Sequence, residues 1–412
     1  MNSGDTAFVI VSAALVFIMT PGLGFFYGGL GRRKNVINNM MASVFILGLG
    51  MVLWFLFGYS LSFSGNTFGI IGSLKDFCLS SHAFDAVSPY ADNLPFLVFV
   101  IFQMMFALIT PAIITGAVAG RMKFKALFIF IAAWSFLVYY PLAHMVWGQG
   151  GLLGGDGLGS IDFAGGNVVH ISSGVSGLIL CLILGKRHGY ERTSYRIHNI
   201  PFVVLGMALL WFGWFGFNAG SALGANALAG HAFMTTSLAT AAGLLSWMLI
   251  DVVRKRKPNL INCCTGVVVG LVAITPGAGF VPVWASFIIG LSAGPVCYYG
   301  IMLVKRKLKF DDALDAFGCH GIGGIWGGLL TGIFADPSVN SATGWWFGNA
   351  SQFFAQVGGI LVSIVVAVVG TLVCVLITKA FTELRVSHRD ELIGLDASQH
   401  GENAYPSFTG LD

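Results

Sequence analysis

Two histidines inside apolar segments are the residues whose type and spacing most clearly suggest chemistry. His170 lies eight residues after Asp162, and His320 lies eight residues after Asp312; in both segments a glycine follows four residues after the histidine. An imidazole can donate and accept hydrogen bonds and can gain a proton near neutral pH. Ionisable groups inside membrane spans are costly and usually mark pathways for protons or polar substrates. The repeated spacing therefore predicts a functional pair.

The composition indicates what kind of element must position this pair. Hydrophobic residues make up 56% of the 412-residue chain and charged residues 10%, against about 25% charged residues in a typical globular protein. The mean hydropathy is +0.81. So few charges cannot cover a water-soluble protein of this size, which excludes a soluble enzyme, a nucleic-acid-binding protein and a disordered chain. The 56 glycines, many of them inside apolar runs, indicate closely packed membrane helices.

Apolar stretches long enough to cross a bilayer recur eleven times along the chain. We expect an all-α polytopic membrane protein with spans at about 7–30, 37–63, 94–119, 124–146, 163–184, 200–220, 231–253, 260–276, 284–304, 314–334 and 354–380. These spans form a membrane domain over residues 1–380, followed by a cytoplasmic tail over 381–412. No signal-peptide pattern precedes the first span, so we expect no cleaved leader.

The basic residues are distributed very unevenly between the connections. If the N-terminus is outside, 21 of the 22 lysines and arginines lie inside, and only Lys75 lies outside. The inner segments are 32–34, 121–125, 186–196, 254–257, 305–309 and the tail. The positive-inside rule therefore predicts a multi-pass protein of the cytoplasmic (inner) membrane with its N-terminus outside and its C-terminus inside. An odd number of spans fits this orientation.

The two histidine segments enter the membrane from opposite sides in this topology. Asp162 lies at the outer end of its span and Asp312 at the inner end of its own. At a rise of about 1.5 Å per residue, each histidine lies about 12 Å from its end and reaches the bilayer midplane. Five spans separate the segments, which predicts an inverted repeat with halves at about 7–185 and 200–334 and a final span at 354–380.

Simpler interpretations remain open for each of these residues. A histidine in an apolar helix can be a hydrogen-bonded packing residue, and Asp162 and Asp312 can each be only a helix N-cap. A metal site is a sharper alternative, but zinc takes three or four ligands and the histidine pair lacks further ligands nearby in the sequence. We predict no metal, no cofactor and no enzyme activity, since no nucleophile and base pattern is present.

Several longer motifs match a known family. They are the segments 162–170, 211–221 and 312–324, together with 21–29, 143–148 and 394–405. In these segments the chain resembles the ammonium transporter (Amt/Mep/Rh) family over nearly its whole length. The likeness is to the microbial and plant Amt branch rather than to the Rh glycoproteins.

The resemblance implies a homotrimer in which each subunit has eleven helices around its own narrow pore. Matched by motif, it assigns an outer ammonium-binding site, a gate of stacked rings and a pore with a proton relay. The outer site is Phe102, Phe106, Trp147 and Ser221; the gate is Phe106, Phe217 and Trp214; the relay is His170 and His320, with Asp162. The alternative for each aromatic residue is packing, since the chain has 35 phenylalanines and ten tryptophans.

These residue types suit the recognition of ammonium. Ammonium and potassium are similar in size, but aromatic faces attract a desolvated cation by about 2 kcal/mol, and a serine oxygen accepts an N–H bond that potassium cannot donate. Below the gate, only a species that can lose its proton crosses an apolar stretch at low cost. We therefore expect electrogenic uptake in which ammonia and the proton pass the histidines separately.

Other functions remain open from the sequence. An ammonium sensor fused to a signalling domain needs the outer site but no conduction, and a neutral gas channel of the Rh type predicts flux without current. The tail extension 406–412 fits either a bare terminus or a cut linker to a further domain. Basic segments 186–196 and 254–257 fit a PII-type signal protein, or the positive-inside rule alone. Gly120 stands where the family commonly has a glutamate, which questions the coupling of this end to the tail.

Overall fold

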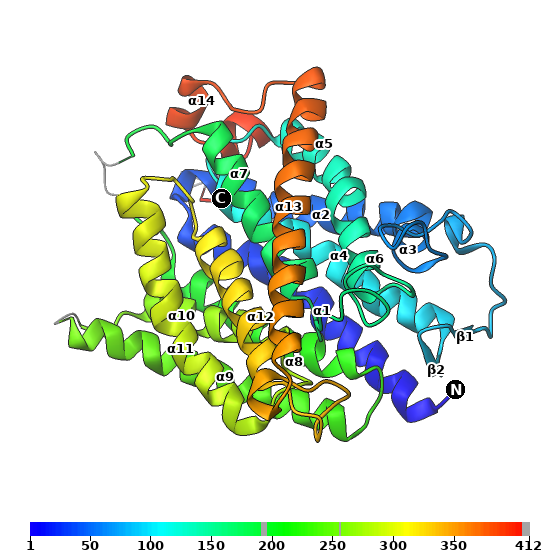
Figure 1. Cartoon of the computed structure of the whole chain (residues 1–412). Helices are drawn as coiled ribbons and strands as arrows, with labels where there is room; N and C mark the ends of the chain where they lie inside the picture. The colour runs from blue at the N-terminus through cyan, green and yellow to red at the C-terminus, as the bar shows by residue number, and fades with distance from the viewer. Residues whose placement is uncertain (191–195, 255–256, 406–412) are drawn as a thin grey trace.

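The computed structural model describes residues 1–190, 196–254 and 257–405, and these residues are predominantly helical (Figure 1). Parts of the predicted basic segments 186–196 and 254–257, and the tail extension 406–412, lie outside the described residues. The α-helices are α1 (Ser3–Leu30), α2 (Val36–Leu53), α3 (Tyr59–Phe63), α4 (Phe96–Val118), α5 (Phe124–Trp134), α6 (Tyr140–Trp147), α7 (Ser172–Leu184), α8 (Ile200–Ala219), α9 (Ala227–Val253), α10 (Leu260–Ile274), α11 (Val283–Met302), α12 (Ile322–Phe334), α13 (Ala350–Phe381) and α14 (His388–Ile393).

Short π-helical turns extend or join several of these helices into longer rods. Trp54–Gly58 joins α2 to α3, Ser135–Tyr139 joins α5 to α6, and Leu303–Lys307 continues α11. Gly166–Ile171 precedes α7, and Phe317–Gly321 precedes α12. Such turns are rare and often occur at functional sites, and the last two contain the two histidines of the sequence motif.

Among the described residues, ten helices are long and apolar enough to cross a membrane. They agree with ten of the predicted spans to within a few residues. The remaining predicted span, 260–276, contains the shorter apolar helix α10, which has 15 residues. At about 1.5 Å per residue it is shorter than a bilayer core of about 30 Å. It ends just before Pro276, which lacks the N–H needed to continue the helix.

Apolar residues both fill the interior and cover the outer surface of the bundle. Large apolar side chains of α13, among them Leu361, Val365 and Leu376, are more than half exposed. In a soluble protein such a surface would be unstable, but in a bilayer it faces lipid. The described residues include one small sheet, a hairpin of β1 (Val87–Ser88) and β2 (Ala91–Pro95), in which Ser88 pairs with Ala91 before α4 begins.

The described part of the tail folds back onto one end of the bundle, at the top of Figure 1, far from the N-terminus. Met122 and Arg385 form an isolated antiparallel bridge, and Lys123 N donates to the Leu384 carbonyl oxygen. The described part of the tail is therefore attached beside the end of α4, next to Gly120. Gly120 has a φ of +78°, a conformation that a residue with a side chain rarely adopts.

Candidate functional site

Asp162 caps the π-helical turn that precedes α7. Its Oδ1 accepts hydrogen bonds from the N–H groups of Gly165 (2.8 Å) and Gly166 (2.6 Å), and its Oδ2 accepts from Asn167 (2.7 Å) and Val168 (3.4 Å). Burial raises the pKa of this carboxyl, and the four N–H groups oppose that rise. The capping interpretation of Asp162 thus agrees with its geometry, and the cap fixes where the following helix begins.

Asp312 does the same for the turn that precedes α12. It accepts hydrogen bonds from the N–H groups of Ala316 (3.1 Å), Phe317 (2.8 Å) and Gly318 (3.3 Å). Burial, followed by the charge of Asp315, raises the pKa of Asp312 to about 6. The repeated Asp–His spacing in the sequence therefore corresponds to a repeated structure: an aspartate, a capped π-helical turn and a histidine inside it.

The two histidines meet in the centre of the bundle. The Nδ1 atoms of His170 and His320 lie 3.2 Å apart, and both side chains are buried. The glycine that follows each histidine permits this approach: a Cβ on Gly174 would lie 2.3 Å from the Gly321 nitrogen, and a Cβ on Gly324 would lie 3.0 Å from the His170 Cβ. Helices with small residues at these points pack closely.

A hydrogen bond between two Nδ1 atoms sets the tautomers of the neutral pair. One ring carries its proton on Nδ1 and leaves its Nε2 as an acceptor, whereas the other carries its proton on Nε2. The Nε2 of His170 is buried and has no hydrogen-bond partner among the described residues. In the neutral pair, the two Nε2 atoms therefore present one acceptor and one donor for a further hydrogen bond.

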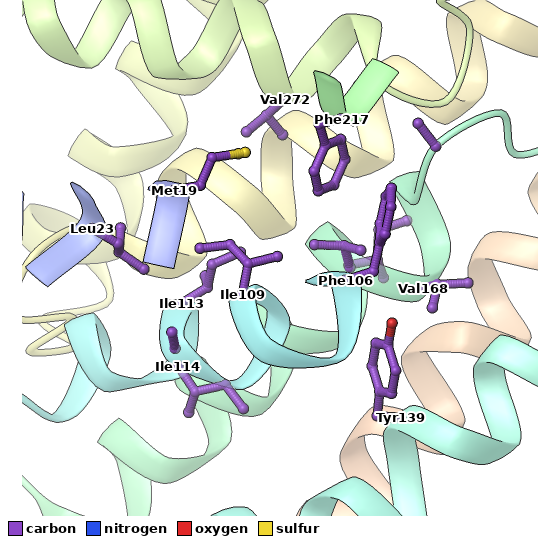
Figure 2. Close-up of a cluster of buried hydrophobic side chains, with 14 of the residues drawn as sticks. Met19, Leu23, Phe106, Ile109, Ile113, Ile114, Tyr139, Val168, Phe217 and Val272 are labelled. Carbon is purple, nitrogen blue, oxygen red and sulfur yellow. The ribbon is translucent and has the colours of Figure 1, made fainter. Parts of the chain in front are cut away.

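A narrow cavity runs beside the pair, and we call it the histidine cavity. Its volume is about 20 Å³, close to the space that a single water molecule requires, about 10–15 Å³. Its walls are mainly apolar. They include Met19 and Leu23 of α1 and Ile109 and Ile113 of α4, whose side chains lie in one buried cluster with Phe217 (Figure 2). A hydrated ion does not fit this space.

Two phenylalanine rings in tilted contact close one end of the histidine cavity. The ring centroids of Phe106 and Phe217 lie 4.4 Å apart. His170 then stacks on Trp214 at 5.4 Å and on Phe217 at 6.1 Å. Trp214 is held in place by its Nε1–H, which donates to Thr275 Oγ1 (2.9 Å). The predicted gate residues and the two histidines thus form one continuous series of contacting side chains.

Beyond Phe106 and Phe217 lies a second cavity of about 160 Å³, which we call the aromatic cavity. Phe102, Phe106, Trp147 and Ser221 all line it, so the structure brings the four predicted outer-site residues together. Trp147 Nε1–H donates to the Asp162 carbonyl oxygen (2.8 Å), and Ser221 Oγ–H donates to the Phe217 carbonyl oxygen (2.9 Å). The serine oxygen therefore keeps lone pairs available for a ligand.

The remaining residues that line the aromatic cavity are not among the predicted site residues. They are Phe63, Tyr90, Phe99, Gln103, Phe163 and Leu223. Tyr90 and Phe99 stack almost parallel, at 4.9 Å and 1°. The β1–β2 loop and α4 bring these two residues together, and no spacing in the sequence signals the contact. Gln103, by contrast, lies between two selected residues, and its Oε1 is buried without a partner among the described residues.

A third cavity, of about 320 Å³, lies at the opposite end of the histidine cavity, and we call it the charged cavity. Lys305, Arg306 and Asp315 line it, and Asp315 also lines the histidine cavity. In the sequence, Lys305 and Arg306 are recognisable only as part of the basic segment 305–309. Among the described residues, no group of three or more histidine, cysteine, aspartate or glutamate side chains is arranged to hold a metal ion.

Comparison with known proteins places these features in a family. The model of the Ammonium Transporter Family matches residues 7–405. The chain is 48% identical to an ammonium transporter of Bacillus subtilis, over 98% of this chain and 99% of that protein. It is 44% identical to the ammonium transporter Amt1 of Archaeoglobus fulgidus, over 98% and 100%.

Solved structures show the same arrangement of helices. The crystal structure of Saccharomyces cerevisiae Mep2 matches with a TM-score of 0.88 and 36% identity, over 99% of this chain and 94% of that chain. A structure described as a sensor Amt protein also matches with a TM-score of 0.88, at 29% identity, over 96% and 98%.

Proposed function

Since the chain belongs to the ammonium transporter family and is a multi-pass membrane protein, we propose how it moves ammonium. The ammonium ion binds in the aromatic cavity, gives its proton to the acceptor nitrogen of the histidine pair on passing Phe106 and Phe217, and crosses the histidine cavity as ammonia. The proton crosses separately through the histidine pair. The observation that supports this proposal is a continuous series of side-chain contacts, which runs from Trp147 through Phe106 and Phe217 to His170 and His320.

The aromatic cavity suits a dehydrated ammonium ion. Phe106 contacts Trp147 at 5.9 Å and Phe102 at 5.1 Å, so several ring faces and edges surround a small volume. Ring faces attract a cation without a formal negative charge, and the Ser221 oxygen accepts an N–H bond. A carboxylate in this position would bind the ammonium ion tightly. Aromatic rings and a hydroxyl bind it weakly enough for the ion to be released toward the histidine cavity.

The histidine cavity suits ammonia and disfavours any ion. A cavity of about 20 Å³ with apolar walls cannot hold a hydration shell, and a bare ion in such surroundings loses many kcal/mol of solvation. Ammonium can avoid this cost by leaving its proton behind, but potassium cannot. The free donor and free acceptor of the histidine pair then hold ammonia or pass the proton.

The topology completes the proposal. We infer eleven spans, with α10 counted as a short buried span, and an orientation with the N-terminus outside and the tail inside the cell. The two aspartate-capped π-helical turns support an inverted repeat of two five-span halves. The homotrimer and a PII-type partner at the tail side follow from the resemblance, and both remain proposals.

The test is an electrical recording. The purified chain is reconstituted in liposomes, and currents are measured on a solid-supported membrane after jumps of ammonium, with potassium as the control. A saturating current for ammonium and none for potassium is the expected result. Transport of ammonia into the liposomes without any current would favour the neutral gas channel and would contradict the separate passage of the proton.

The sensor alternative is less favoured than transport. The ammonium transporters of Bacillus subtilis and Archaeoglobus fulgidus are 48% and 44% identical to this chain, whereas the sensor structure shares 29% identity. The same recording separates the two functions. Ammonium binding without any current would establish a sensor and overturn transport.

A further inference from the structure

An ion pair stands at the mouth of the charged cavity. Lys305 Nζ lies 2.6 Å from Asp315 Oδ1, and each side chain is 30% exposed. Asp315 lines both the charged cavity and the histidine cavity, so this residue lies where the two cavities adjoin. A species that leaves the histidines passes this carboxylate, and in this structure the carboxylate already binds a primary ammonium group.

The position of Asp315 is fixed by the backbone around it. Its φ is +61°, which is uncommon for a residue with a side chain. The preceding residues are tied to the end of α4, because Ala313 N donates to the Ala117 carbonyl oxygen and Leu314 N to that of Gly116. The Asp315 carbonyl oxygen in turn accepts a hydrogen bond from Cys319 N (2.9 Å). Tolerance of strained backbone is typical of functional positions.

The side chains that line the cavity carry an excess of positive charge, although the buried carboxyl of Asp312, which does not line it, also acts on Lys305. Two cationic side chains, Lys305 and Arg306, line it together with the single carboxylate of Asp315. A cavity with a positive excess repels cations that approach from solution, but it leaves a neutral molecule unaffected. Ammonia can therefore leave through it freely, whereas an ammonium or potassium ion is opposed.

We propose that Asp315 forms a second binding site for small ammonium cations, at the exit, and that Lys305 Nζ occupies it as a tethered competitor. The lysine keeps the carboxylate from holding the transported ion after it regains its proton, and it opposes the entry of cations from the tail side. The inference rests on the proposed function, because it assumes that ammonia leaves at this end. Lys305 thus weakens the binding of ammonium at the exit, whereas the aromatic cavity attracts the same cation.

The experiment measures inhibition by ammonium on the exit side. Inward currents are recorded in vesicles of known protein orientation while the internal ammonium concentration is raised. In Lys305→Met, the freed carboxylate should bind internal ammonium, so the concentration that halves the current should fall by roughly two- to fivefold, as expected for one partly exposed charge pair. Lys307→Met is the matched control, because Lys307 is exposed, lies on the same π-helical turn and does not line the charged cavity.

Two further variants keep the result interpretable. Lys305→Arg retains a cation and should behave as the unchanged chain, and Lys305→Met combined with Asp315→Asn should lose the added inhibition. Equal inhibition in Lys305→Met and Lys307→Met, with both variants folded by their melting temperatures, overturns the proposal and leaves the ion pair as a structural contact. An unchanged chain that carries no ammonium current refutes the proposed function instead.

Discussion

The aromatic cavity and the charged cavity lie at the two ends of one route but have opposite chemistry. Among the described residues that line the aromatic cavity there is no carboxylate and no basic side chain; its walls are aromatic rings and Leu223, with the hydroxyl groups of Tyr90 and Ser221 and the amide of Gln103. The charged cavity has two cations and one carboxylate. The same small cation can therefore be attracted at one end by the faces of aromatic rings and repelled at the other end by cationic side chains.

The histidine pair is what separates the two cavities, so its removal should have the largest effect. We expect His170→Leu combined with His320→Leu to lower the ammonium current by about 100-fold or more, because positioned proton transfer contributes on the order of 10²- to 10⁴-fold. The current after ammonium jumps measures this. A current equal to that of the unchanged chain would show that the route needs no relay and that the two cavities are joined in some other way.

The stability of the protein at the charged end should depend more on acid pH than its stability at the aromatic end. Arg187 Nη2 lies 2.6 Å from Asp311 Oδ1, and the Asp311 side chain is fully buried. Burial opposes the ionisation of Asp311, but Arg187 and Arg121 more than compensate and hold its pKa below the usual 3.8. The ionised carboxylate thus contributes stability that is complete above that ordinary pKa and is lost as the pH falls through the lower pKa of the folded protein.

The matching variant is Asp311→Asn, which leaves buried Arg121 without this partner. We expect a loss of about 3 kcal/mol at pH 7, the usual cost of breaking a buried pair. Melting temperatures are measured between pH 7 and pH 3. The difference in melting temperature between the variant and the unchanged chain should become smaller only at the lowest pH values. A difference that stays constant down to the lowest pH would indicate that packing, not charge, explains the loss.

The aromatic end should respond through affinity and show little effect of acid. Trp147→Leu removes one ring face from the cavity, and we expect the ammonium concentration for half-maximal current to rise about tenfold, which corresponds to about 1.4 kcal/mol of cation attraction. Trp346→Leu is the control, because Trp346 is 67% exposed and does not line the cavity. An unchanged concentration in Trp147→Leu, in a folded protein, would remove this ring from the cation site.

Much of this molecule could be predicted from local sequence. Ten predicted spans coincide with long apolar helices, because hydropathy is a property of each segment by itself. The exception is 260–276, where Pro276 ends α10 early. The aspartate-to-histidine spacing was also informative, since a cap and the helix that it starts lie in one short stretch of chain. The family motifs supplied the aromatic residues that spacing alone could not distinguish from packing residues.

Tertiary structure alone decided which of these residues meet. The 3.2 Å contact of His170 with His320 depends on Gly174 and Gly324, which let two distant helices approach. The pairing of Lys305 with Asp315 joins the end of α11 to a loop that α4 holds in place. Local sequence specifies how apolar a segment is and where its helix begins. Distances between rings and between charges depend on packing between helices, and that packing is set by the shapes of all the neighbouring side chains together.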